Sequence, residues 1–242
     1  MKKYFIDEGE TFAINDELGA RVELIGWEEH PIIYIDNFYK NPDKVRNLAL
    51  RCPPTKNKRV CGCLPGSRVD MNMDLDHLGE VWKDVALNCY GLTIAEQPHF
   101  EQACRNVPFS VNVTQSPDRV KLPHVDIPRE GDDKSRGWAG LIYLNKGKEC
   151  KGGTGFYSYK GMTTVNPFQE GIWDEDYVAD DIGPWKLEHL ADMKYNRMIF
   201  YPDHVLHGSY DKEGFFEGDD YRLVQVFFLP LHFAKTEGQP YG

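Results

Sequence analysis

The chain has 242 residues, a length that fits one large β-rich domain with a substantial core. Its 38 acidic and 28 basic residues give a formal net charge of -10, which would repel a phosphate backbone, so we expect no nucleic-acid partner. Hydrophobic residues make up 41% of the chain, yet no apolar run approaches the roughly 20 residues of a membrane helix, so we expect no membrane partner.

The N-terminal residues and the cysteines both favour a cytoplasmic protein. Two early lysines are followed by Asp7 and Glu8 before any apolar stretch develops, which is unlike a secretory signal. The six cysteines have no zinc-ribbon spacing. We expect them to be reduced thiols, although Cys61 and Cys63, with Cys52 nearby, leave a metal site open.

The first third of the chain is predicted to contain strands and two helices. Short apolar runs bounded by turn residues predict strands at Thr11–Ile14, Arg21–Ile25 and Pro31–Asp36. Asn41-Pro42-Asp43 then combines a capping residue, a proline at the first helical position and an acid in the first turn, which predicts the start of a helix. Helical spacing of apolar residues predicts a second helix at about 76–90.

The stretch 52–74 lies between the two predicted helices and is rich in proline, glycine, asparagine and charge. Such a composition predicts a long surface loop, which could act as a lid. The stretch 160–184 is similarly irregular, and a loop of that length inside a domain usually has a function.

A β pattern dominates from about residue 100 onward. Six strands are predicted, at Phe109–Thr114, Val120–Asp126, Trp138–Asn145, Thr154–Tyr159, Tyr195–Tyr201 and Tyr221–Leu229. No linker divides the chain, so we predict a single domain over 1–242. Residues 1–100 supply strands and supporting helices, and residues 101–242 supply the core.

Two residues of metal-binding type stand two positions apart in the predicted strand Val120–Asp126. Because alternate residues of a strand point to the same face, the His124 imidazole and the Asp126 carboxylate can meet on one ion. Two histidines and one carboxylate, with open coordination positions, are the ligands of non-haem Fe(II) oxygenases. A third ligand must come from a distant part of the chain.

The segment after the predicted strand Tyr195–Tyr201 offers two histidines for this third position, His204 and His207. We favour His207, because the following Gly208 and Ser209 would let the backbone turn tightly beside an ion. His204 remains the alternative.

The part of the chain from Val111 to Arg222 resembles the Fe(II)- and 2-oxoglutarate-dependent dioxygenases, and within them the prolyl-hydroxylase-like branch. The motifs that carry the resemblance are, in chain order, Pro123-His124-Val125-Asp126, Tyr143-Leu144-Asn145, Gly152-Gly153-Thr154-Gly155-Phe156, Asn196-Arg197-Met198-Ile199-Phe200 with the following His207, and Arg222. The resemblance covers somewhat under half of the chain. It implies a mostly β fold, namely a double-stranded β-helix (jelly-roll, cupin-like) core with N-terminal strands and two supporting helices.

The resemblance also implies a set of site residues. Fe(II) would be held by His124, Asp126 and His207, and the C5 carboxylate of 2-oxoglutarate would be held by Arg222 and Tyr143. An arginine suits this task because its planar fork pairs a carboxylate bidentately and cannot lose its charge. Two alternatives stay open: Arg222 as a surface partner of the nearby acids 219 and 220, and Tyr143 as an ordinary core residue.

The chain departs from the family pattern at two positions. Val224 stands where relatives often have a serine or threonine, so one hydrogen bond to the cosubstrate is missing or replaced. Gln115 stands where relatives have a cosubstrate-facing tyrosine, and Asn112 and Thr114 are further polar candidates there.

The predicted function is that of an oxygenase that uses Fe(II), 2-oxoglutarate and O2. As the resemblance implies, it would hydroxylate an unactivated C–H bond of a small molecule, an amino acid or a peptide side chain, and would release succinate and CO2. Two other classes are kept, a cupin-type metal enzyme without 2-oxoglutarate and a catalytically silent jelly-roll binding module. The oligomeric state is left open.

Overall fold

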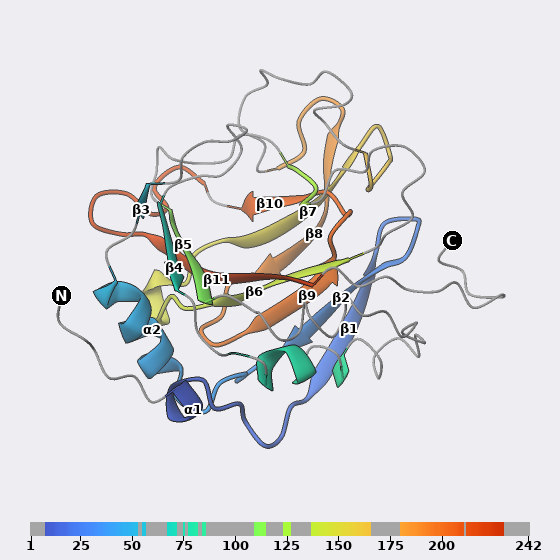
Figure 1. The fold of residues 1–242 in the computed structure, drawn as a ribbon. Coiled ribbons are helices and arrows are strands. Elements are labelled where there is room, and N and C mark those ends of the chain that lie inside the picture. The colour runs from blue at the N-terminus through green and yellow to red at the C-terminus, as the bar shows by residue number, and fades with distance from the viewer. Residues whose placement is uncertain are drawn as a thin grey trace.

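Two antiparallel β-sheets face each other in the computed structural model, and the helices lie against the larger sheet (Figure 1). The structure describes residues 8–52, 55–56, 67–71, 75, 77–81, 84–85, 109–114, 123–126, 137–165, 180–210 and 212–229. The predicted fold class, a mostly β protein with a jelly-roll-like core and flanking helices, is confirmed.

The larger sheet has eight strands and the smaller sheet has three. In spatial order the larger sheet consists of β1 (Ala20–Ile25), β2 (His30–Ile35), β9 (Met198–Pro202), β6 (Trp138–Tyr143), β11 (Arg222–Leu229), β5 (Phe109–Thr114), β4 (Ser67–Met71) and β3 (Thr55–Lys56). The smaller sheet consists of β10 (His207–Tyr210), β7 (Gly153–Tyr159) and β8 (Trp185–Asp192). The helices are α1 (Glu8–Thr11), α2 (Pro42–Arg51) and a short 3-10 helix at Gly147–Glu149.

Seven predicted strands are confirmed in place, with small shifts of their ends: β1, β2, β5, β6, β7, β9 and β11. The helix that begins at Asn41-Pro42 is confirmed as α2, whose Asn41 side chain donates to the Glu10 carbonyl and not to the helix itself. Of the second predicted helix, residues 77–81 and 84–85 are helical and the rest lies outside the described residues.

The strand predicted at Thr11–Ile14 is wrong. This segment contains the end of α1, and Ile14 makes only an isolated bridge to Tyr39. Phe12 explains the apolar signal without a strand, because its ring is fully buried against the rings of Tyr39 and Phe109.

The prediction that 52–74 forms one long loop is wrong in part. Residues 55–56 and 67–71 form β3 and β4, and β4 extends the larger sheet by pairing with β5. Turn-forming residues concentrated between these two short strands dominate the composition of the stretch, which hides the strands. The remaining residues of the stretch lie outside the described ones.

Two strands of the smaller sheet, β8 and β10, were absent from the sequence prediction. In β8, Trp185 and Ala191 are buried whereas Lys186 and Asp192 are exposed, an alternation that is typical of a strand with one buried face. The four residues of β10 are too few to show a clear alternation of buried and exposed side chains. The predicted tight turn at residues 208–209 is wrong, because both residues belong to β10.

The core has two main parts, one on each face of the larger sheet. The outer part joins the sheet to α2 through residues such as Val45 and Phe200. The inner part lies between the two sheets and includes Tyr143, Phe156 and Val224. In the described part of the chain, no helix is both long and apolar enough to span a membrane.

Candidate functional site

The segment 123–126 lies beside β10 and extends the smaller sheet. The backbone N–H of His124 donates to the His207 carbonyl at 2.8 Å, and the N–H of His207 donates back to the His124 carbonyl at 2.9 Å. The N–H of Asp126 donates to the Asp203 carbonyl at 2.9 Å. Residues 123–126 of the strand predicted at Val120–Asp126 therefore form an isolated bridge and not a regular strand. Residues 120–122 lie outside the described part.

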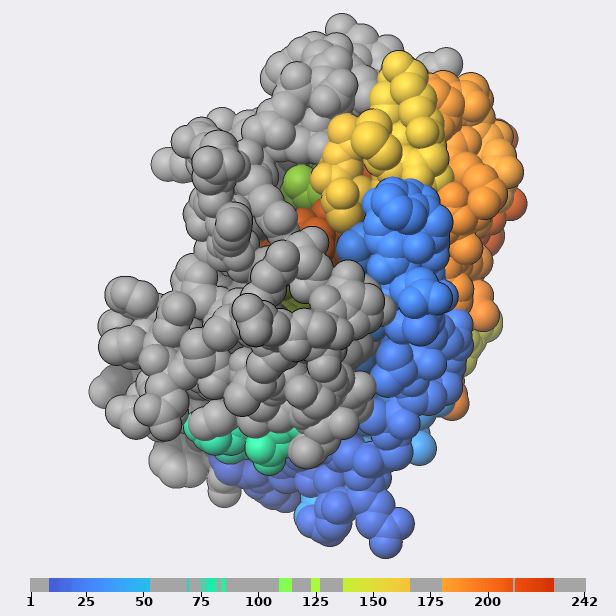
Figure 2. Space-filling view, turned by 90° about the vertical axis from the view of Figure 1, so that its right-hand side faces the viewer, coloured from blue at the N-terminus to red at the C-terminus, as the bar shows by residue number. Residues whose placement is uncertain are grey.

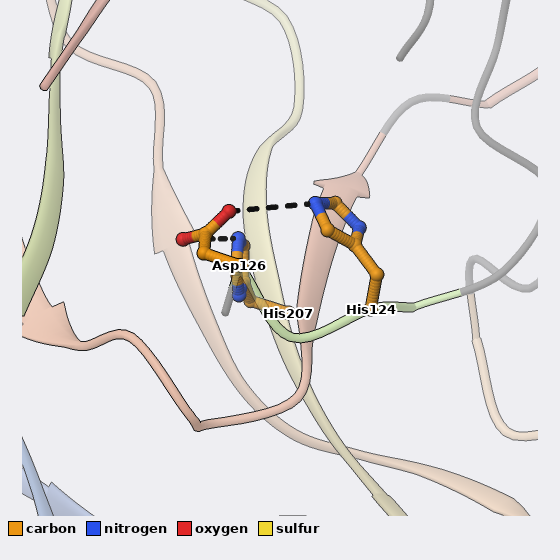
Figure 3. Close-up of side chains that lie close together, drawn as sticks. All are labelled: His124, Asp126 and His207. Atoms are coloured by element: carbon orange, nitrogen blue, oxygen red, sulfur yellow. Dashed lines mark ion pairs between the residues drawn. The ribbon is translucent and has the colours of Figure 1, made fainter. Parts of the chain in front are cut away.

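This pairing brings His124, Asp126 and His207 together (Figure 3). One ligand atom from each lies within 4.8 Å of the others. Nε2 of His124 is 3.8 Å from one carboxylate oxygen of Asp126, and Nε2 of His207 is 3.4 Å from the other. Figure 3 shows the carboxylate facing both imidazoles, which is the arrangement needed to surround one cation.

A second hydrogen bond sets the orientation of the His207 ring. Its Nδ1 lies 2.9 Å from the Val205 carbonyl, which accepts the Nδ1 proton, so Nε2 is the nitrogen that faces Asp126. His204 lies elsewhere: its ring packs edge-on against His30 at 5.5 Å, and its Nδ1 is 3.5 Å from an Asp203 oxygen. The geometry thus groups His207, and not His204, with the other two residues.

Burial and the shared carboxylate affect the two imidazoles differently. Burial, together with the neighbouring His207, lowers the pKa of His124 to about 4, although the Asp126 charge opposes the shift. Burial alone would lower the pKa of His207, but the charge and hydrogen bond of Asp126 and the Val205 carbonyl outweigh it, so this pKa is raised. The three side chains can thus offer two imidazole nitrogens and a carboxylate to a cation, which would compete with a proton for Nε2 of His207.

Aromatic rings pack against the His207 imidazole from the inside of the protein. Tyr201 lies at 4.8 Å and Phe156 at 6.3 Å between ring centroids. Burial, helped by the Asp126 charge, raises the pKa of Tyr201 well above its usual value, so its phenol stays neutral. These rings hold His207 in place and keep its inner side dry.

Arg222 is buried in the space between the two sheets, 5% exposed. Its Nη2 donates to the Gly153 carbonyl at 3.3 Å and to the Thr154 hydroxyl at 3.4 Å, while its buried Nε has no partner. Within the described residues it makes no ion pair with a carboxylate, and Asp220 pairs instead with Lys151 at 2.9 Å. A surface ion pair is therefore not its role, and a buried cation in this state suits an anionic ligand.

Tyr143 lies beside this guanidinium, with its ring centroid 5.9 Å from the Arg222 carbon. Its hydroxyl is 2.8 Å from the Thr154 hydroxyl and 3.1 Å from the Ala191 carbonyl. Burial raises the pKa of Tyr143 to about 12, although the Arg222 charge opposes the shift. Tyr143 is thus both a core residue and a neighbour of the buried cation.

Thr154 joins Arg222 and Tyr143, and sequence reasoning missed it as a site residue. Its signal was present in the Gly152-Gly153-Thr154 motif, because Thr154 and Phe156 share one face of β7 and Phe156 points between the sheets. The two glycines allow the approach of neighbouring strands. A Cβ at 152 would lie 1.9 Å from the Tyr210 carbonyl oxygen, and a Cβ at 153 would lie 2.1 Å from the Ala191 carbonyl oxygen.

The inner face of β5 is polar. Asn112 is the cross-strand partner of Val224, and Thr114 is the partner of Arg222, so these side chains share the face that carries the buried guanidinium. Asn112 is half-buried and Thr114 is buried. Gln115 lies outside the described residues, so its predicted contact with a cosubstrate remains a prediction.

The surface is hollowed near the three grouped side chains. In Figure 2 the hollow lies beside the hairpin of β1 and β2, in blue, and the segment that ends β7, in yellow. Green and orange-red atoms, the colours of residues around 109–126 and around β10, are visible at its bottom.

Three comparisons place the chain among known proteins. No curated protein sequence matches it. A solved structure that it resembles is a prolyl-4-hydroxylase from Pseudomonas putida, with 14% sequence identity, a TM-score of 0.45, and coverage of 86% of this chain and 94% of that one. A model of a family of unknown function, DUF6445, matches residues 16–170, and the chain therefore belongs to that family.

Proposed function

We propose that the protein is a non-haem Fe(II)- and 2-oxoglutarate-dependent oxygenase. The observation that carries the proposal is the pairing of two sites between the sheets: the group of His124, Asp126 and His207, and the buried Arg222 without a carboxylate partner among the described residues. A metal site alone fits many enzymes. A metal site beside a buried cation fits an enzyme that binds an anionic cosubstrate.

The metal-site residues suit Fe(II). Two imidazoles and one carboxylate on one side of an ion leave coordination positions open for a cosubstrate and O2. The Val205 carbonyl orients His207, which is the kind of supporting hydrogen bond that metal-binding histidines have. Bound Fe(II) would supply the activation of O2, whose two oxygen atoms would enter succinate and the hydroxylated product, with CO2 released.

The residues around Arg222 suit a dicarboxylate. Arg222 would hold the far carboxylate of 2-oxoglutarate through its Nε–H and another N–H in the plane of its guanidinium. Thr154 would donate its hydroxyl to the same carboxylate, since it already lies 3.4 Å from Arg222. Tyr143 would close the apolar side of this pocket and would donate its hydroxyl proton to Thr154, which leaves the Thr154 proton for the carboxylate.

The proposed reaction is hydroxylation of an unactivated C–H bond. Its substrate would be a small molecule, an amino acid or a peptide side chain that enters from the hollow seen in Figure 2. The chain's own contribution would be to bind and orient the cosubstrate and to exclude water on the side of Tyr201 and Phe156.

Anaerobic titration with Fe(II) and 2-oxoglutarate tests this proposal. The chelate of metal and keto acid should produce a weak visible charge-transfer band, and Asp126→Ala combined with His207→Ala should abolish it. His204→Ala is the matched control and should keep the band, because that imidazole lies outside the group. Absence of the band in the parent protein would reject the proposal, and a band in the double variant would show that the ligands are wrong.

Arg222→Gln separates the proposal from its two alternatives. In a 2-oxoglutarate enzyme this variant should still bind metal but need much more 2-oxoglutarate to develop the band. A cupin-type metal enzyme would bind metal equally in parent and variant and show no band with the keto acid. A silent jelly-roll module would bind neither.

A further inference from the structure

The strand β1 forms one edge of the larger sheet, and its outer side is exposed. Among the described residues it pairs only with β2, and it is the first strand in the spatial order of the sheet. Val22 is 39% exposed and Leu24 is 55% exposed, on the same face of the strand. Figure 2 shows this hairpin in blue as a strip that runs along the surface.

The backbone of β1 directs its free hydrogen-bonding groups away from β2 at these same residues. Leu24 lies opposite Pro31, which has no N–H to donate. The Leu24–Pro31 pair is therefore a non-hydrogen-bonded pair of the antiparallel ladder, in which the N–H and C=O groups of Leu24 point away from β2. The two pair types alternate along the ladder, so the same groups of Val22 and Ala20 also point away from β2. A further strand can pair with β1 through these three residues.

The other sheet edges in the described part are less open. The segment 123–126 bonds to β10, and β3 has only two residues. In β8 the exposed residues are the charged Lys186 and Asp192, and the aliphatic side chains are buried or half-buried. Among the described strands at a sheet edge, β1 alone combines six residues with exposed aliphatic side chains.

We propose that β1 is a dimerisation strand, to which a second copy of this chain adds its own β1 in antiparallel direction with Val22 on the two-fold axis. In this register Arg21 lies directly opposite Glu23 of the second copy, and Glu23 lies opposite the second copy's Arg21. Leu24 of each copy lies opposite Ala20 of the other. The strand is thus complementary to itself in charge.

Charge selects this register over its nearest competitors. Outward-pointing backbone groups on every second residue also allow the axis to pass through the neighbouring residues Arg21 or Glu23. Either of these axes would place two like charges opposite each other, which destabilises a strand pair, whereas an axis through Val22 gives two opposite-charge pairs.

The two charged side chains already occupy the required face. Arg21 and Glu23 are ion-paired within one copy, and their side chains are 49% and 38% exposed. The Arg21 guanidinium is held 3.8 Å above the Tyr34 ring, and Glu23 lies 3.3 Å from the Nε2 of His189. Both groups are therefore ordered near the edge and accessible to a second copy.

Charge reversal tests the proposal in the full-length protein by light scattering and sedimentation velocity over a range of concentrations. The parent should form a dimer. Arg21→Glu and Glu23→Arg should each raise its dissociation constant about tenfold, because each creates like-charge pairs across the axis. The double variant with both reversals should restore dimerisation. A monomeric parent, or single reversals that leave the dimer unchanged, would overturn the proposal.

A second pair of variants addresses the apolar contact. Val22→Lys would place two ammonium groups opposite each other on the axis and should give a monomer, whereas Leu50→Lys on α2 adds the same charge at an equally exposed site and should leave the dimer intact. Circular dichroism and thermal melting verify that each variant is folded. Equal dimerisation of Val22→Lys and Leu50→Lys would show that the interface lies elsewhere.

Discussion

Thr154 illustrates how the position of a single hydroxyl depends on which strands face each other. The dioxygenases that the sequence resembles often have a hydroxyl two residues after the arginine, where this chain has Val224. In the structure Val224 is part of the inner core, and the hydroxyl near Arg222 comes from Thr154 on the opposite sheet. Under the proposed function, Thr154 would supply the hydroxyl that Val224 does not have.

At this scale we predict that Thr154→Val weakens 2-oxoglutarate binding by about tenfold or more, because a hydrogen bond to a charged group contributes about 1.5–3 kcal/mol. Thr154→Ser should retain most of the affinity. Titration of the Fe(II) complex with 2-oxoglutarate measures this, and the metal affinity measured in parallel should stay unchanged. Equal affinity of the valine and serine variants for 2-oxoglutarate would remove the hydroxyl from the site.

At the scale of elements, hydrogen bonds between charged residues connect the end of β2 to the start of β9. Asp36 follows β2 and receives two hydrogen bonds from Arg197, at 2.6 and 3.1 Å, and one from Lys194 at 2.7 Å. The Arg197 hydrogen bond lowers the pKa of Asp36 to about 2, although partial burial opposes the shift. The carboxylate is therefore more acidic in the folded chain than in the unfolded chain.

The lowered pKa of Asp36 predicts a contribution to stability that is complete above about pH 4 and is lost as the pH falls toward 2. Asp36→Asn should therefore lower the free energy of unfolding at pH 7 by up to about 1 kcal/mol, since solvent screens the pair. Between pH 4 and pH 2 its stability should vary less than that of the parent. Urea unfolding at these pH values measures both effects, and parallel curves for the two proteins would contradict the prediction.

The contact between β7 and β8 depends on a residue without a side chain. A Cβ at Gly153 would lie 2.1 Å from the Ala191 carbonyl oxygen, on the neighbouring strand, so the backbone would have to move. We predict that Gly153→Ala lowers the free energy of unfolding by about 1–3 kcal/mol. Gly19→Ala is the control, because nothing lies within 4 Å of its added Cβ, and it should stay within about 0.5 kcal/mol of the parent.

At the scale of the whole molecule, the proposed metal site joins segments that are far apart in the chain. His124 and Asp126 come from one segment, and His207 comes from a strand some eighty positions later, bonded to it along the backbone. A ligand that needs all three side chains binds the folded protein and not the unfolded chain. Its binding free energy therefore adds to the stability of the fold.

We accordingly predict that Mn(II), used as a redox-stable substitute for Fe(II), stabilises the parent protein by about 2.7 kcal/mol at a hundredfold excess over its dissociation constant. His207→Ala should lose this stabilisation, and His204→Ala should keep it. Thermal unfolding with and without the metal measures the effect. An equal shift of the melting temperature in both variants would contradict the proposed ligands.

Local sequence patterns alone predicted much of the fold and the shared face of two of the three proposed metal ligands. The alternation of apolar residues predicts β1, β2, β5, β6, β7, β9 and β11, and Asn41-Pro42 predicts the start of α2. These features depend on neighbours in the chain. The shared face of His124 and Asp126 was likewise predicted from their spacing of two, and the structure brings their ligand atoms together.

Only the tertiary structure decided the remaining features. The sequence favoured His207 over His204, but only the pairing of β10 with the segment 123–126 brings His207 to His124 and Asp126. The burial of Arg222 depends on the closing of one sheet over the other. The hydroxyl of Thr154 meets Arg222 for the same reason. Such contacts join residues separated by tens of positions, and no short-range period in a single sequence specifies which distant strands will meet.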